Sequence, residues 1–206
     1  MKKFWNEYGK LIKRMWLNLF GAAVFGFSVL FCAQALVRDD NSHNFIYVIA
    51  GIISAVFYGY LLYLLAWEAG AKDKIRADGG RTEPCPNRGL KIALVYTIPA
   101  AVFIAVYLVT SIVYHATGTD NKAFLSVLNF SGMIGQAFQM PFVCFGILLF
   151  GNLGVNIAKT GDTLPYALFL AATLAPAVLV IWLGYLFGYH GKFKSKMYGP
   201  KKKNEE

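Results

Sequence analysis

The chain has 206 residues, of which 57% are hydrophobic and only 15% are charged, a composition too apolar for an ordinary soluble domain. The formal net charge is +9, but the basic residues flank long apolar runs, which argues against nucleic-acid binding. This placement indicates that the basic residues orient the chain in a membrane, and attraction to anionic lipid headgroups is a second role for them. Apolar runs of about twenty residues match a hydrocarbon core of roughly 30 Å, so the lipid bilayer is the expected partner of the chain.

Four apolar stretches predict membrane-crossing helices. The first two cover residues 16–37 and 45–67, and the short polar connection between them predicts an antiparallel helical pair. Helical pattern continues past the second span to Asp78, where Gly79-Gly80 supplies a stop. The third span covers residues 92–114, with a kink expected at Pro99, and the last covers residues 166–189, with Pro176 near its middle.

The distribution of positive charge predicts the topology. The N-terminus, the loop at 68–91 and the tail at 190–206 together hold 17 of the 20 lysines and arginines, which places all three in the cytoplasm. An even number of crossings follows, so a single crossing by the apolar stretch at 124–158 is rejected. This stretch is expected to be a helical hairpin bent near Gln139-Met140-Pro141, and each arm of about 26 Å leaves open a re-entrant hairpin or two short spans.

The predicted fold is therefore an all-α, polytopic membrane helix bundle with six apolar helices, forming a single domain over residues 1–206. The expected location is the cell membrane of a bacterium, with both termini in the cytoplasm.

The hairpin is the most polar of the apolar stretches. Its candidate pocket-lining residues are Asn129, Gln136, Gln139 and Asn152, because a broken helix at membrane depth needs protein or water to satisfy its backbone and can line a cavity. The alternative is that these amides bond neighbouring helices while the hairpin's glycines allow close packing. Gly184-x-x-x-Gly188 in the last span also permits close helix contact, which leaves a homo-oligomer or another membrane-protein partner open.

The motifs of soluble enzymes are missing from the sequence. It has no nucleotide-binding loop, no zinc-hydrolase motif and no serine-hydrolase motif. Its three histidines are isolated and its three cysteines unclustered, so no metal site and no cofactor are expected. No ionised side chain lies in the middle of a predicted span, which removes the usual carrier of proton-coupled pumping. The chain is predicted not to be an enzyme.

The loop after the second span carries a recognisable pattern. Trp67 to Arg76, Gly80-Arg81, Gly89 to Ala93 and Ile98-Pro99 together resemble a pattern in small multi-pass bacterial membrane proteins of no assigned activity. The resemblance implies that this cytoplasmic loop is a shared feature of that group. Its alternating charges make Lys72, Asp73 and Arg76 a candidate docking surface for a partner, and the alternative is a solvated, ion-paired helix.

Two main hypotheses for the function remain. One is a small-solute transport component whose site is lined by the hairpin and the proline-containing helices. The other is a non-transporting membrane partner or assembly factor that acts through its cytoplasmic loop and basic tail. A membrane-embedded enzyme is third.

Overall fold

A computed structural model describes residues 2–36, 44–81, 83, 85–118, 121–150 and 163–191, and within these ranges it consists of helices and their connections, without strands. The helices are α1 (Lys2–Leu36), α2 (Asn44–Asp78), α3 (Arg88–Thr117), α4 (Lys122–Phe138), η1 (Met140–Phe142), α5 (Val143–Phe150), α7 (Thr163–Ala172) and α8 (Leu174–His190).

Within the described part of the chain, four helical stretches are long and apolar enough to cross a membrane, and they correspond to the four predicted spans. They are Phe4–Leu36, Phe45–Asp78, Arg88–Thr117 and Thr163–His190. A fifth apolar segment, α4 followed by η1 and α5, is bent by 83° at its break. The predicted all-helical membrane bundle with a broken segment is thereby confirmed.

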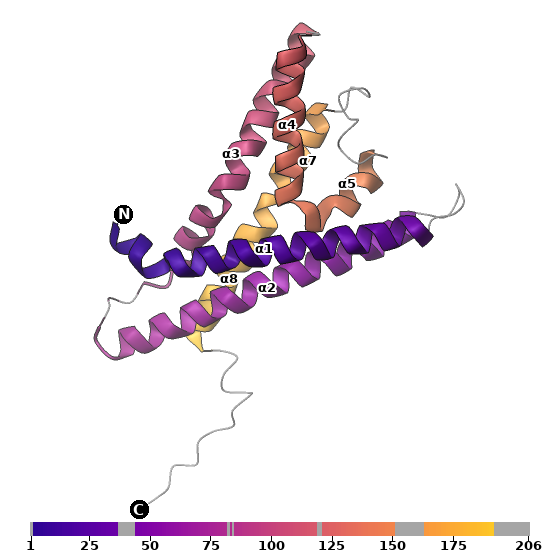
Figure 1. The fold of residues 1–206 in the computed structure, drawn as a ribbon. Coiled ribbons are helices and arrows are strands. Elements are labelled where there is room, and N and C mark those ends of the chain that lie inside the picture. Colours follow the sequence, from indigo (N-terminus) through magenta and orange to yellow (C-terminus); the bar gives the residue numbers. More distant parts are fainter. Residues whose placement is uncertain are drawn as a thin grey trace, which may run out of the picture.

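The helices form a V (Figure 1). One arm, the α1–α2 arm, contains the end of α1 and the start of α2, and the other, the α3–α4–α7 arm, contains the second half of α3 with α4 and α7. The arms join in a trunk, made of the starts of α1 and α3 and the ends of α2 and α8. Each part has its own buried cluster, represented by Ile12, Leu62, Ile92 and Tyr185 in the trunk, Leu30 and Ala50 in the α1–α2 arm, and Ile104, Leu128 and Leu170 in the α3–α4–α7 arm.

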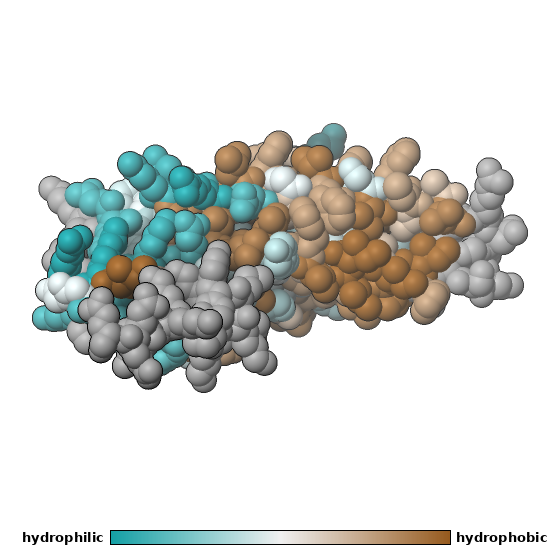
Figure 2. All heavy atoms as spheres, turned by 90° about the horizontal axis from the view of Figure 1, so that it is seen from below, coloured by the Kyte–Doolittle hydropathy of each residue, from teal (hydrophilic) through white to brown (hydrophobic). Residues whose placement is uncertain are grey.

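The long helices extend past the predicted spans at the trunk end. Both α1 and α2 have 35 residues, or about 52 Å at 1.5 Å per residue, which exceeds a hydrocarbon core of roughly 30 Å. The extension of α2 to Asp78 confirms the sequence prediction, whereas the early start of α1 was not predicted because its first turns are basic. Figure 2 shows hydrophilic side chains gathered at one end and an apolar surface over the remainder. Side chains such as Phe20, Phe31 and Phe45 are 66–70% exposed, as expected for contact with lipid.

The prolines act differently in the two helices that contain them. Helix α3 continues through Pro99. The last span is divided at Thr173 into α7 and α8, because Pro176 has no N–H to donate to the carbonyl of Ala172, the last residue of α7.

Glycines bring α2 and α8 into close contact in the trunk. A Cβ added to Gly188 would lie 2.1 Å from the Trp67 carbonyl oxygen, and one added to Gly70 would lie 2.1 Å from the Tyr185 carbonyl oxygen. Gly184 similarly faces the Tyr63 carbonyl. The predicted close contact at Gly184 and Gly188 is therefore made within one chain, between two parallel helices.

The chain leaves α3 for the broken segment and returns to the same half of α3 in α7. Gly132 and Gly135 of α4 pack against Tyr107 and Ile104, and Tyr166 near the start of α7 forms an edge contact with the Tyr107 ring. The chain thus leaves this region in α4 and is back beside it in α7, as a hairpin requires. At the 83° bend the chain turns from α4 into α5, which lies between the two arms (Figure 1) and packs through Cys144 and Ile147 in the buried cluster of the α1–α2 arm. The end of the predicted hairpin, at 151–158, lies outside the described residues.

Candidate functional site

The break between α4 and α5 lies where the two arms meet. Helix α4 ends at Phe138, and the backbone N–H of Gln139 donates to the carbonyls of Gly135 and Gln136. Pro141 cannot continue the ladder because it has no N–H, so the chain turns through η1 before α5 begins. The predicted break at Gln139-Met140-Pro141 is confirmed in position.

Glycines of α1 and α2 make room for this turn. A Cβ on Gly26 would lie 3.1 Å from the carbonyl oxygen of Met140, and a Cβ on Gly51 would lie 2.9 Å from the Phe145 ring. The break therefore sits directly against the α1–α2 arm, while α4 itself packs in the α3–α4–α7 arm. One short segment connects the two arms.

A polar cluster surrounds the break inside the bundle. The Tyr58 and Tyr96 hydroxyls are 3.0 Å apart, and the indole N–H of Trp16 donates to the Tyr96 carbonyl oxygen at 3.1 Å. Gln139 is only 3% exposed, and its buried Oε1 has no hydrogen-bond partner among the described residues. A buried amide oxygen without a partner is costly, by about 1–3 kcal/mol, which makes this atom the clearest candidate for binding an external donor.

Gln139 and the aromatic side chains enclose a small cavity of about 10 Å³, close to the least space that one buried water needs. None of the side chains that line it is ionised. They are Trp16, Leu19, Tyr58, Tyr96, Thr97, Ala100, Phe138, Gln139, Leu174 and Ala177. They come from every long helix and from the break, so a change in the angle between the arms would alter the cavity.

The structure separates the four candidate pocket residues. Gln139 lines the cavity, whereas Gln136 is buried at 8% exposure but does not line it. Asn129 is exposed on α4, and Asn152 lies outside the described residues. The sequence analysis missed Trp16, Tyr58 and Tyr96, and the available signal was three polar aromatic residues within otherwise apolar spans.

A second polar cluster, which we call the Asp73 network, joins four helices in the trunk. The Asp73 side chain is 4% exposed, and its Oδ2 accepts hydrogen bonds from the hydroxyls of Tyr8 on α1 (2.5 Å) and Tyr185 on α8 (2.7 Å). Arg88 at the start of α3 donates to the Tyr8 hydroxyl (2.9 Å), and its Nη1 lies 3.8 Å from the same carboxylate oxygen. A buried carboxylate is stable only when it is paired and hydrogen-bonded, and these contacts meet that requirement.

The candidate docking residues are divided by this arrangement. Asp73 faces the interior of the trunk, whereas Lys72 is exposed and paired with Glu68. Arg76 is also largely exposed and lies 3.3 Å from Glu7 of α1. Of the three residues, only Lys72 and Arg76 therefore present their side chains at the surface.

Neither a metal site nor a match to a known protein accompanies these clusters. Among the described residues, no group of three or more histidine, cysteine or acidic side chains could hold a metal ion. No protein-family model, curated protein or solved structure matches the chain.

Proposed function

We propose that the protein is a membrane component that conducts or carries a small, neutral, polar solute, with the cavity beside Gln139 as its binding site. The observation that carries the proposal is the unpaired, buried Gln139 Oε1 at a broken helix. Broken helices with polar side chains at membrane depth are a common construction for solute sites in transporters.

The chemistry of the cavity supports a neutral solute. Gln139 offers an acceptor, and the Tyr58 and Tyr96 hydroxyls can both donate and accept. An ion would leave water without an opposite charge among the lining residues, at a large desolvation cost. A hydroxyl or amide group of a small solute matches these partners.

The geometry also supports a change of shape during the cycle. The cavity has room for about one water, so a larger solute enters only after the arms separate. The arms have separate cores and are connected by the break, which is therefore the natural hinge.

The proposal is tested by stopped-flow light scattering of proteoliposomes, with glycerol and urea as probes. Gln139→Leu is expected to reduce the protein-dependent flux of at least one probe at least tenfold. Gln136→Leu, three residues earlier at the end of α4 and outside the cavity, is the matched control and is expected to keep the flux. Wild-type flux equal to that of protein-free liposomes would refute the proposal. An equal loss of flux in both variants, with both shown to be folded by circular dichroism, would refute it as well.

We infer further that both termini lie in the cytoplasm of a bacterial cell. The start of α1 and the end of α8 meet in the trunk through Tyr8, Asp73 and Tyr185, which supports placing both termini on one side. The excess of lysine and arginine there indicates the cytoplasmic side. With single cysteines at 159 and 196 in a background without native cysteines, an impermeant maleimide added to intact cells is expected to label only position 159. Labelling of position 196 alone would show that the topology is wrong.

One observation supports the alternative, a partner or assembly factor. A surface cleft of about 210 Å³ lies between α1 and α2, and its lining includes the basic Lys10, Arg14, Lys72 and Arg76 and the acidic Glu7, Glu68 and Asp73. Lys72 and Arg76 pair with Glu68 and Glu7, so a partner segment with acidic side chains would compete for these basic groups and would also meet Lys10 and Arg14. Under this alternative, a complex that copurifies with the protein is lost in the Lys72→Ala/Arg76→Ala double variant. This variant removes the 3.6 Å contact between Arg76 and Asp73 but keeps the contacts of Asp73 with Tyr8, Tyr185 and Arg88. A copurified complex that survives this double variant would count against it.

A further inference from the structure

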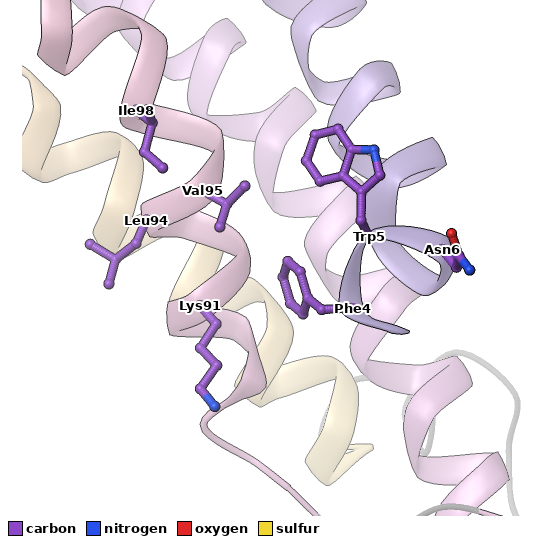
Figure 3. Close-up of a pocket in the computed structure, with 7 residues that line it drawn as sticks. All are labelled: Phe4, Trp5, Asn6, Lys91, Leu94, Val95 and Ile98. Carbon is purple, nitrogen blue, oxygen red and sulfur yellow. The ribbon is translucent and has the colours of Figure 1, made fainter. Parts of the chain in front are cut away.

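An open groove lies between the first turns of α1 and α3 (Figure 3). It shares no lining residue with the cavity beside Gln139. Its volume is about 780 Å³, within the usual range for ligand sites. It is lined by Phe4, Trp5, Asn6, Lys91, Leu94, Val95 and Ile98.

The groove changes from polar to apolar along α3. In Figure 3, the Lys91 ammonium points toward the loop that precedes α3, whereas Leu94, Val95 and Ile98 follow along the helix away from that loop. Leu94 and Ile98 are 52% and 53% exposed. Trp5 is 45% exposed, and its indole is the type of side chain that favours the boundary between headgroups and acyl chains.

The charge at the polar end is uncompensated within the described residues. The Lys91 ammonium has no carboxylate within 4.0 Å there, and Glu7, the next acidic residue along α1 from the groove, pairs instead with Arg76. A cation beside an apolar groove matches an occupant that has an anionic head and an apolar tail. A wholly apolar helix of another protein would leave the ammonium unpaired.

We propose that this groove binds one anionic phospholipid, with its phosphate at Lys91 and an acyl chain along Leu94, Val95 and Ile98. Phe4 and Trp5 cover the chain from the α1 side. The lipid would add a contact between α1 and α3 at the trunk surface, beside the Arg88–Tyr8 and Trp16–Tyr96 hydrogen bonds that join these helices in the interior. This inference does not depend on the proposed solute site.

Trp5 provides a local reporter for the test. The protein is reconstituted into phosphatidylcholine nanodiscs that contain a fixed fraction of one brominated lipid, which is phosphatidylglycerol in one sample and phosphatidylcholine in the other. Brominated acyl chains quench the fluorescence of nearby indoles. The contribution of Trp5 is the difference between the wild type and Trp5→Phe. Brominated phosphatidylglycerol is expected to quench Trp5 at least twofold more strongly than brominated phosphatidylcholine.

Two lysine variants separate a specific site from general charge attraction. Lys91→Gln is expected to make the two lipids quench Trp5 equally, whereas Lys13→Gln, an exposed lysine of α1 outside the groove, keeps the difference. Equal quenching in the wild type would overturn the proposal, and so would a preference that survives Lys91→Gln. Absence of quenching by both lipids, together with crosslinking between protein copies through position 98, would show that a second copy covers the groove and would also overturn it.

Discussion

Replacing Asp73 with alanine is the sharpest test of how the trunk is held together. The substitution removes the carboxylate that accepts from Tyr8 and Tyr185 and that faces Arg88. Removing one partner of a buried ion pair costs about 3–5 kcal/mol. Because the Arg88 side chain is 20% exposed and can reach water, we expect the lower limit, about 3 kcal/mol, or roughly a hundredfold in the unfolding equilibrium constant.

The measurement is the free energy of unfolding in mixed micelles, from titration with sodium dodecyl sulfate followed by tryptophan fluorescence. Asp73→Asn retains an oxygen that can accept from the tyrosine hydroxyls but loses the charge that faces Arg88, so about half of the destabilisation is expected. Asp78→Ala is the matched control, because Asp78 is 64% exposed and pairs with Lys74 on the same helix at 3.3 Å. Such surface pairs contribute about 1 kcal/mol or less. If Asp73→Ala destabilises no more than Asp78→Ala, the Asp73 network does not hold the trunk and this reasoning is refuted.

Two further predictions follow from packing. Gly188→Ala is expected to destabilise the protein strongly, since its Cβ would lie 2.1 Å from the Trp67 carbonyl oxygen. The control is Gly21→Ala, whose Cβ meets nothing within 4 Å and which should leave the same detergent titration unchanged. Equal effects of the two substitutions would contradict the close contact of α2 and α8. In mild detergent, a maleimide is expected to label exposed Cys32 at once and fully buried Cys144 only after unfolding. Mass spectrometry measures the labelling of each cysteine. Rapid labelling of Cys144 would show that the packing of α5 is wrong.

The spans and the break were predictable because they depend on local properties of the sequence. Long apolar runs define membrane helices through the thickness of the hydrocarbon core, and Pro141 lacks the N–H that would continue the helical hydrogen bonds at the break. The division of the last span at Thr173 follows from the same physics at Pro176, and the sequence analysis noted that proline without predicting the division. Pro99 shows the opposite outcome, because α3 continues through it.

The position of Asp73 shows why the contents of the sites were harder to predict. Its neighbours Lys72 and Lys74 are charged, so the segment suggested a solvated face. The buried positions of α2 nevertheless continue at helical spacing from Tyr58 through Leu62, Ala66 and Gly70 to Asp73. The helical periodicity could therefore have predicted that Asp73 is buried. The partners of Asp73 lie on three other helices and are distant in sequence, so the pattern of a single sequence does not reveal them.

The V-shaped arrangement leads to a last prediction, which concerns motion. If the break is a hinge, the arms change their separation while the trunk, held by the Asp73 network and the α2–α8 contact, does not. Spin labels at Ile52 on α2 and Val109 on α3, both exposed, report the arms, and labels at Ile75 and Leu94 report the trunk.

Glycerol, or whichever probe shows flux, is expected to shift the distance between the arm labels to longer values, because the cavity beside Gln139 holds about one water in this form. The distance between the trunk labels should stay constant. A ligand shifts the protein toward the arrangement that it binds better, and the two proposed arrangements differ in the arms and not in the trunk. Arm distances that remain unchanged with every conducted probe would show that solute passes through a fixed pathway, and the break would then serve packing alone.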